Sequence, residues 1–509
     1  MRKIQKILVA NRSEIAIRVM RAAAELDIAS VAIYSEEDRF ALHRFKVAES
    51  YRIGAGCSPV QAYLQTDEIV QAAVLSGADA IHPGYGFLSE SPEFARACET
   101  AGLVFIGPSP EVMNRLGNKV QARALAQENQ VPVMPASGVL PSDPATVRAL
   151  ASETGYPLML KASWGGGGRG MRVIESEAEL DAMVDIGRRE AATAFGNDEV
   201  YLEKLVRRAR HIEVQVLGDQ HGNLVHLFER DCTVQRRNQK VVERAPAFFL
   251  TDAERESVCE AALRLCRGAG YHNAGTVEFL QDADSGEFYF IEVNPRIQVE
   301  HTVTEEITGI DIVKAQIQIA QGHAIGTEAS GVPAQLQIAM RGHAMQCRIT
   351  TEDPENNFIP DYGEIDTYRS PSGFGIRLDA GTAYTGARVT RHYDSLLVKV
   401  TGWGNTPHEV VQRMLRALRE FRVRGVNTNM PFLVGLLSNE KFCRADYTTR
   451  FIDKTPELMT FPRRRDRTTR LLRFIGDITV NGNSAVAGRR LPQSPRVPRV
   501  PPVSGLALQ

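Results

Sequence analysis

Cysteine and long hydrophobic runs are scarce in this sequence. Its 509 residues include seven cysteines, none of them in a C-x-x-C spacing. An odd, scattered set of thiols argues against a disulfide framework and against a zinc site, and favours a reducing compartment. No apolar run approaches the ~18 residues that a membrane span needs, and a strand-like run at residues 4–9 leaves no room for a signal peptide. We therefore predict a cytoplasmic protein without a membrane partner, or one that is already processed.

An excess of charge of one sign is missing as well. The formal net charge is −1 and the isoelectric point is about 6.9, so no global field draws the chain to nucleic acid. Basic clusters occur at residues 207–208 and 463–465, but aromatic residues do not alternate with them. We predict no nucleic-acid partner. A chain of this length is expected to form roughly three or four domains.

The first part of the chain lacks a dinucleotide fingerprint. Apolar strand-like runs alternate with amphipathic helical patterns over residues 4–110, which predicts a doubly wound parallel sheet. A helix is expected from Ser13 to Glu25, after a first strand at residues 7–10. The turn between them reads Ala-Asn-Arg-Ser and not G-x-G-x-x-G, which argues against a dehydrogenase.

A glycine-rich loop joins two predicted strands, at residues 157–161 and 171–174. Four consecutive glycines, residues 165–168, let backbone N–H groups approach an anion closely. Lys161, at the end of the first strand, can place a point charge on a phosphate. A flexible linker would have the same composition, but the flanking strands favour a lid over phosphates.

A predicted β-hairpin in the middle of the chain brings two carboxylates face to face. If the hairpin is symmetric about Ser285, Glu278 stands opposite Glu292 and Thr276 opposite Asn294. Like charges that face each other across a strand pair repel. A divalent cation between them is the obvious reason for the pair, because Mg²⁺ takes carboxylate oxygens together with substrate phosphates.

The same alternation extends beyond the hairpin. It places Arg296, Gln298 and Glu300 on the side of the two carboxylates, although Pro295 makes strict strand geometry uncertain. A metal, a cation, an amide and a spare carboxylate on one surface indicate a phosphate-handling active site. The alternative is a hairpin face whose charges simply contact water.

The last third of the chain changes character twice. Residues 343–450 form an α/β-type region, with a strand expected at 395–400 and a helix at 409–421. Residues 491–502 are rich in proline and predict an extended linker. The sequence therefore looks like the front part of a longer protein.

Several motifs in this order resemble the ATP-grasp enzymes, and among them the biotin carboxylases. The resemblance runs from Ile7 to about residue 455, and its further motifs are H-P-G-Y-G-F-L-S-E at 82–90, E-R-D-C at 229–232, Q-K-V-V-E at 239–243 and C-R-I at 347–349. It implies an α/β protein with an ATP-grasp fold, an N-terminal doubly wound parallel-sheet domain, a small lid domain and a C-terminal α+β domain. The expected segments are 1–118 (N-terminal domain), 119–342 (ATP-grasp domain with lid 133–206), 343–455 (C-terminal domain) and 456–509 (linker and proline-rich tail).

Four stretches are more specifically similar to the pyruvate carboxylases. They are residues 59–64, Trp164 before the glycines, residues 451–458 and residues 476–482. Such enzymes continue into a carboxyltransferase domain and a biotin carrier domain, which we expect as partners. The sequence contains no Ala-Met-Lys-Met biotinylation site. We therefore expect the biotin carboxylase portion of a pyruvate carboxylase, as a homodimer or part of a tetramer.

The resemblance implies a nucleotide site. It assigns ATP contacts to Lys119, Lys161, Gly165, Gly166, Gly167, Gly168, Met171, Glu203, Lys204, Val206, His211, Gln235 and Asn238. The expected cofactors are ATP, Mg²⁺ or Mn²⁺ in its place, and biotin as a substrate on a carrier. Glu278, Glu292 and Asn294 would hold the metal, in agreement with the hairpin argument.

The resemblance also implies a reaction, the ATP-dependent carboxylation of biotin by bicarbonate through carboxyphosphate. Bicarbonate would lie against Arg296, Gln298 and the Val299 backbone. Glu300 would remove its proton, Lys240 would add positive charge near the transferring phosphoryl group, Arg348 would stabilise the enolate oxygen of biotin, and Tyr85 would lie beside the biotin ring. Residues that match a dimer interface are Arg18, Arg21, Glu25, Phe374 and Arg377.

Two positions depart from the family pattern. Asn238 stands where His is expected, so a contact near the ribose or phosphates would carry no charge. Ser13 replaces a Gly, which predicts that its turn does not need a positive φ. Two alternatives stay open at this point: another ATP-grasp ligase, such as a carbamoyl-phosphate-type enzyme, and a non-catalytic nucleotide-binding and assembly fragment.

Overall fold

The computed structural model describes residues 3–164, 171–461 and 467–482. The chain forms two units, residues 1–460 and 461–509, and each is described by itself. The predicted glycines Gly165, Gly166, Gly167 and Gly168 and the proline-rich tail lie outside the described residues. Within the described part, no helix is long and apolar enough to cross a membrane.

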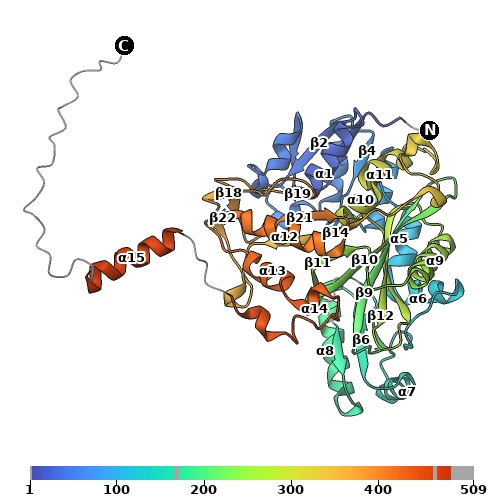
Figure 1. Cartoon of the computed structure of the whole chain (residues 1–509). Coiled ribbons are helices and arrows are strands. Elements are labelled where there is room, and N and C mark those ends of the chain that lie inside the picture. Colours follow the sequence, from blue (N-terminus) through green and yellow to red (C-terminus); the bar gives the residue numbers. More distant parts are fainter. Residues whose placement is uncertain (1–2, 165–170, 462–466, 483–509) are drawn as a thin grey trace, which may run out of the picture. The chain divides into compact units, whose positions relative to one another are not determined.

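A five-stranded parallel sheet opens the first unit (Figure 1). Its order is β3-β2-β1-β4-β5, and every pair is parallel, which confirms the predicted doubly wound sheet. The strands are β1 (Lys6–Val9), β2 (Ala29–Tyr34), β3 (Glu49–Arg52), β4 (Ala80–His82) and β5 (Val104–Phe105), and the helices are α1 (Ser13–Ala24), α2 (Pro59–Ala62), α3 (Thr66–Leu75), α4 (Pro92–Thr100) and α5 (Pro110–Gly117). Apolar side chains such as Ile7, Leu8 and Val9 are fully buried, because helices cover both faces of such a sheet.

The turn into α1 corrects one prediction. Ser13 has a φ of +58°, so the expectation that this turn avoids a positive φ was wrong. A left-handed residue other than Gly costs roughly 1–2 kcal/mol. The position is enclosed: the Ser13 N–H lies 3.4 Å from His43 Nδ1, and a Cβ at Gly381 would overlap the Ser13 hydroxyl. Only a small side chain fits in this turn.

The lid is a small three-stranded antiparallel sheet with its own core. Its order is β7-β6-β8, and the elements are α7 (Pro144–Thr154), β6 (Leu158–Ala162), β7 (Arg172–Ile174), α8 (Glu177–Phe195) and β8 (Val200–Lys204), after α6 (Lys119–Glu128). It projects at the lower end of Figure 1. Leu160 pairs with Arg172, so the glycine-rich segment joins two antiparallel strands, as predicted.

An eight-stranded sheet forms the centre of the first unit. Its order is β13-β12-β9-β10-β11-β14-β21-β19, with β9 (Ala209–Gly218), β10 (Leu224–Arg236), β11 (Gln239–Ala245), β12 (Asn273–Asp282), β13 (Phe288–Asn294), β14 (His343–Thr350), β19 (Ile376–Ala380) and β21 (Leu396–Gly404). The helices packed on it include α9 (Asp252–Ala269), α10 (His301–Thr308), α11 (Ile312–Ala320) and α12 (Pro407–Glu420). Because β11 pairs with β14, the sheet is continuous across the expected boundary at 342–343. The division into domains stays a prediction.

The predicted hairpin register is present at its functional end. Thr276 pairs with Asn294, and Glu278 with Glu292. The hairpin is not symmetric, however, because Phe279 pairs with Phe290 and leaves Ile291 as a β-bulge. The bulge shifts the pairing by one residue, and this shift places Glu292 opposite Glu278.

The remaining elements are short. They are β15 (Glu352–Asp353), β16 (Ile359–Pro360), β17 (Gly363–Glu364), β18 (Thr367–Arg369), β20 (Arg388–Val389), β22 (Arg422–Arg424), α13 (Met430–Leu437) and α14 (Glu440–Cys443). The described part of the second unit is helix α15 (Arg467–Asn481), within the segment expected as a linker.

Candidate active site

One cleft of about 1130 Å³ gathers the predicted site residues. All of them that the structure describes line it: Tyr85, Lys119, Lys161, Met171, Glu203, Lys204, Val206, His211, Gln235, Asn238, Lys240, Glu278, Glu292, Asn294, Arg296, Gln298, Val299, Glu300 and Arg348. These residues come from stretches that lie far apart in the sequence, from Tyr85 to Arg348, and the fold brings them together.

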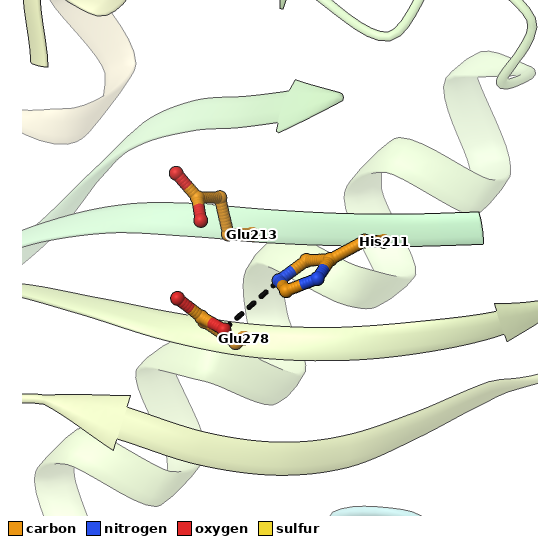
Figure 2. A group of neighbouring side chains, drawn as sticks. All are labelled: His211, Glu213 and Glu278. Atoms are coloured by element: carbon orange, nitrogen blue, oxygen red, sulfur yellow. Dashed lines mark ion pairs between the residues drawn. The ribbon is translucent and has the colours of Figure 1, made fainter. Parts of the chain in front are cut away.

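Three glutamates stand in a row across neighbouring strands. Glu278 on β12 pairs in register with Glu292 on β13 and with Glu213 on β9. Figure 2 shows Glu213 and Glu278 on one face of the sheet together with His211, which lies two residues before Glu213. Glu213 is fully buried and Glu278 is 5% exposed. Such a row of like charges is stable only with cations beside it.

Lys240 supplies the central cation. Its ammonium lies 3.1 Å from Glu278 and 2.6 Å from Glu300, and it also pairs with Glu213. Burial opposes the charged form of Lys240, but the three carboxylates raise its pKa well above the usual value. Burial likewise opposes the charge of Glu278, whose pKa is nevertheless lowered well below 4.5 by Lys240 and His211.

A lysine contacts the outer carboxylate, Glu292, and a histidine contacts the middle one, Glu278. Lys119 Nζ lies 2.6 Å from Glu292, and His211 Nε2 lies 2.9 Å from Glu278. The Gln235 side-chain amide donates to His211 Nδ1 at 2.8 Å. This bond fixes the tautomer that directs the Nε2 proton toward Glu278.

Arg230 pairs with Glu213, the buried end of the row of glutamates. It is fully buried, and it lies opposite Glu213 in the β9–β10 register. Its guanidinium donates five hydrogen bonds, to Glu213 (2.5 Å), Gln215 (2.8 Å), Thr304 (3.0 Å), Thr276 (3.1 Å) and Gln298 (2.8 Å). All five of its N–H donors are therefore satisfied within the chain, and one of them holds Gln298, which lines the cleft.

Glu300 is buried between cations. Its exposed fraction is 2%, and one oxygen lies 2.6 Å from Lys240 and the other 3.0 Å from Arg348. Burial alone would raise the pKa of Glu300, but Lys240, Arg348 and Arg230 lower it below 4.5. Arg348 is held in turn by Glu243 at 2.5 Å. The carboxylate is therefore ionised at neutral pH and able to accept a proton.

Arg296 connects the hairpin with the loop at residues 82–90. It donates to Glu90 at 2.6 Å and to Asn294 Oδ1 at 2.8 Å. The side-chain amides of Asn294 and Gln298 both donate to Glu278 at 2.9 Å. Two amides and a guanidinium thus converge on one edge of the carboxylate row.

The nucleotide side of the cleft is formed by the lid strand β8 and helix α6. Glu203 pairs with Lys161 and lies 3.3 Å from Arg123. The Lys204 ammonium donates to the carbonyls of Gly155 and Tyr156 at 2.8 and 2.7 Å. The Lys204 charge is thus directed at the lid backbone.

Asn238 has a conformational role that the sequence did not reveal. Arg236 pairs with Gln239, so Arg237 and Asn238 form a two-residue hairpin turn. Both have a positive φ, +50° and +61°, as in a type I′ turn, where Asn is strongly preferred. The positive φ of this turn therefore explains why Asn, and not His, stands at position 238.

The described residues allow a test of the metal prediction. Two groups of three have ligand atoms within 4.8 Å of one another, His211–Glu213–Glu278 and Glu213–Cys232–Glu300. Both need Glu213, whose oxygens already pair with Arg230 and Lys240. The predicted ligands Glu278 and Glu292 lie toward the open end of the row, at Glu292, and offer carboxylate oxygens that suit a hard cation. The Glu278 oxygens also have partners in the chain, so the metal site stays a prediction.

The residues predicted for a dimer interface divide into two groups. Arg18 lies 2.9 Å and Arg377 2.7 Å from Glu305, so both guanidiniums are paired within the chain. Arg21, Glu25 and Phe374 are exposed. The interface stays a prediction.

Sequence reasoning missed Glu213, Arg230 and Glu243. The signal was present at residues 211–215, where three polar side chains alternate with two apolar ones. Such a strand normally turns its polar face to water. Here Glu213 and Gln215 are buried, where Arg230 joins them to Thr304 of α10.

Comparisons with known proteins show what the chain is similar to. Profiles of the biotin carboxylase N-terminal domain and C-terminal domain match residues 3–113 and 346–454, and the ATP-binding domain of the carbamoyl-phosphate synthase L chain matches residues 118–327. The biotin carboxylase domain of 2-oxoglutarate carboxylase from Hydrogenobacter thermophilus is 43% identical, with a TM-score of 0.87; the match covers 91% of this chain and 100% of that one.

The chain belongs to the biotin carboxylase family. This family consists of ATP-grasp ligases, which agrees with the predicted fold. The two flanking matches are both to biotin carboxylases, so neither a carbamoyl-phosphate-type enzyme nor a non-catalytic fragment is favoured.

Longer relatives of this biotin carboxylase chain are pyruvate carboxylases. The enzyme of Bacillus subtilis is 52% identical over 489 residues, which are 96% of this chain and 42% of that protein. A pyruvate carboxylase structure from Rhizobium etli is 61% identical with a TM-score of 0.89, over 99% of this chain and 45% of that one. The chain thus spans less than half the length of these relatives.

Proposed function

We propose that this chain carboxylates biotin with bicarbonate and ATP, as the first half-reaction of a pyruvate carboxylase-type enzyme. The observation that carries the proposal is the Lys240–Glu300–Arg348 cluster at the end of the carboxylate row. The Hydrogenobacter relative was solved with MgADP and bicarbonate, which supports the same ligands here. Phosphoryl transfer depends mainly on positioned cations and metal, and this cleft supplies those cations.

The nucleotide side would bind ATP between the lid and the sheet. Lys119 and Lys161 would contact phosphates under the glycine loop, and the segment 203–206 would hold adenine. His211, Gln235, Asn238 and Met171 complete the predicted contacts. Lys119 and Lys161 now pair with Glu292 and Glu203, so phosphates would replace carboxylates as their partners.

A divalent cation fits between the phosphates and the open end of the row. Glu278 and Glu292, with Asn294 beside them, would hold Mg²⁺; Mn²⁺ has the same ligand preference. When bound, the metal supplies positive charge that offsets the charge of the phosphates. Lys119 beside Glu292 then becomes free to contact the nucleotide.

Bicarbonate would lie against Arg296, Gln298 and the Val299 backbone. Glu300 takes its proton, a bicarbonate oxygen attacks the γ-phosphorus, and ADP leaves, which gives carboxyphosphate. Lys240 stabilises the transferring group. Because Lys240 is also the nearest cation of Glu300, its movement toward the phosphoryl group raises the pKa of Glu300 and makes it a better base.

Carboxyphosphate then separates into CO₂ and phosphate inside the cleft. Biotin N1 gives its proton to the released phosphate, Arg348 stabilises the enolate oxygen that this forms, and N1 then captures the CO₂, while Tyr85 packs beside the biotin ring. In a pyruvate carboxylase-type enzyme the biotin is carried by a carrier domain and serves a carboxyltransferase domain. We propose the same two partner domains, an oligomer and a cytoplasmic location for this chain; one relative, from Mus musculus, is named mitochondrial.

The test is ADP release from MgATP, with and without bicarbonate and free biotin. The proposal expects release that needs bicarbonate and is stimulated by biotin. Release that ignores biotin would overturn the acceptor assignment, and release without bicarbonate would overturn the reaction.

A further inference from the structure

One turn of the N-terminal sheet holds the loop that carries Tyr85. The Asn11 side-chain amide donates to the carbonyls of Pro83 and Tyr85, at 2.7 and 2.8 Å. The packing is tight, since a Cβ at Gly84 would lie 2.9 Å from Asn11 Nδ2. Three residues after Asn11, Glu14 accepts a hydrogen bond from the Tyr85 hydroxyl. Both the backbone and the side chain of Tyr85 are therefore fixed by this turn.

The other oxygen of Glu14 leads to a second site group. It lies 3.0 Å from the ammonium of Lys399 on β21, and the two side chains are 3% and 0% exposed. The same ammonium donates to the carbonyl of Val299 at 3.0 Å. Tyr85 and Val299, both proposed to contact the substrates, are thus joined through one buried ion pair.

The surroundings of this pair are charged as well. Asp379 faces Lys399 across β19 and β21, and Arg377 pairs with Asp379 at 2.8 Å. Burial raises the pKa of Glu14, and Lys399 opposes that rise. His301, which is fully buried nearby, has a pKa lowered well below its usual value, first by burial and then by Lys399. The pair is therefore a buried contact among several charged groups.

Stability alone is a weak reason for such a pair. A buried ion pair can often be replaced by apolar residues of similar size without loss of stability. Glu14 and Lys399 also contact more than each other. Each makes a second hydrogen bond, to a residue that lines the cleft. The bond to Tyr85 leads to the proposed biotin contact, the bond to Val299 leads to the peptide next to it that also faces bicarbonate, and neither leads to the nucleotide.

We propose that Glu14 and Lys399 are positioning residues, which fix the Tyr85 ring relative to the Val299 peptide and thereby couple ATP cleavage to carboxyl transfer. The inference rests on the proposed function. The geometry separates two tasks: Glu300, Lys240 and Arg296 form carboxyphosphate, and the Glu14–Lys399 pair holds biotin where the released CO₂ is captured. Without the pair, ADP and phosphate still form, but the CO₂ escapes.

The experiment uses the double variant Glu14→Gln/Lys399→Met, which removes both charges and so avoids an unpaired buried ion. ADP and carboxybiotin are measured together with free biotin as acceptor. A matched control is Glu229→Gln/Arg255→Met, which removes both charges of a buried ion pair outside the cleft, 3.0 Å apart. Tyr85→Phe keeps the ring and removes only the hydroxyl bond to Glu14.

The inference expects the double variant to keep bicarbonate-dependent ADP release without biotin within about twofold of the parent chain. Carboxybiotin per ADP falls at least about tenfold, or ~1.4 kcal/mol, and Tyr85→Phe raises the KM for biotin but not for ATP. The control Glu229→Gln/Arg255→Met keeps the parent ratio.

Two results would overturn the inference. One is a folded double variant with the parent ratio of carboxybiotin to ADP. The other is an equal loss of both products, which marks a structural role only. If the double variant does not fold, an unchanged KM for biotin in Tyr85→Phe overturns the inference by itself. A parent chain that makes no carboxybiotin would refute the proposed function instead, so the two failures are distinct.

Discussion

The two sheets of the first unit differ in what they bury. The parallel sheet buries apolar side chains such as Leu8, Ile33 and Ile81, all fully enclosed. The eight-stranded sheet encloses Arg230 and Lys399 as completely. Burying an ion costs several kcal/mol even after relaxation, so charges are retained only where they are paired or perform chemistry. The first sheet builds the fold, and the second builds the reaction centre.

Removal of Arg230 should give the largest effect and sharpen this comparison. Arg230→Met leaves Glu213 buried beside Glu278 with one cation fewer, which should cost about 3–5 kcal/mol, and Gln298 loses its partner. Leu8→Ala in the parallel sheet should cost a similar ~2–5 kcal/mol. Thermal unfolding and ADP release measure both variants.

The two variants should differ in activity. The folded fraction of Leu8→Ala keeps the parent rate, whereas folded Arg230→Met loses most of it. Equal activity of the two folded variants would contradict the division between the sheets.

The pH dependence tests the electrostatics of the charged sheet. Because the pKa values of Glu278 and Glu300 are lowered below 4.5 in the folded chain, their contribution to stability is complete above pH 4.5. It is lost as the pH falls from there through the lowered values. Lys240→Met removes the largest opposing charge of both groups and should therefore raise the pKa values of both carboxyls.

The midpoint of acid unfolding of Lys240→Met should therefore move to higher pH. Thermal unfolding between pH 3 and pH 7 measures it, with Leu8→Ala as a control whose acid midpoint does not move. Parallel pH curves for Lys240→Met and the parent chain would mean that Lys240 is not the counter-charge.

The open end of the carboxylate row should show a smaller effect. Glu292→Gln keeps the shape of the side chain and removes one ligand charge, so MgATP binding should weaken about tenfold, or ~1.4 kcal/mol. Titration calorimetry measures it, and binding of ATP without the metal should change less. Equal affinities for MgATP would remove Glu292 from the metal site.

Asn238 should matter least. Asn238→His places a less suitable residue at a positive φ and adds a ring that can carry charge at low pH. These changes oppose each other, so the KM for ATP should change by less than about threefold. A much larger change in KM would show that the side chain, and not the turn, determines this position.

The contrast between the sheets also explains what the sequence could predict. Buried parallel strands are continuous apolar runs, so the strand at 29–34 and the helix that begins at Ser13 could be located directly. The pairing of Glu278 with Glu292 followed from a hairpin taken as symmetric about Ser285. The Ile291 bulge that produces this pairing could not be predicted. The burial of Arg230 and Lys399 could not be predicted, because a charged side chain in a strand is usually solvated. Only the folded structure shows that these two are enclosed.

Tracing the oxygen of bicarbonate tests the central claim most directly. With ¹⁸O-labelled bicarbonate, MgATP and biotin, attack on the γ-phosphorus transfers one bicarbonate oxygen into each phosphate formed. Glu300→Ala should bind ATP normally and form no labelled phosphate, because the base is gone. The account predicts one ¹⁸O per ADP in the parent chain. Phosphate that carries only solvent oxygen would mean that water attacks ATP, and the reaction proposed for this cleft would be wrong.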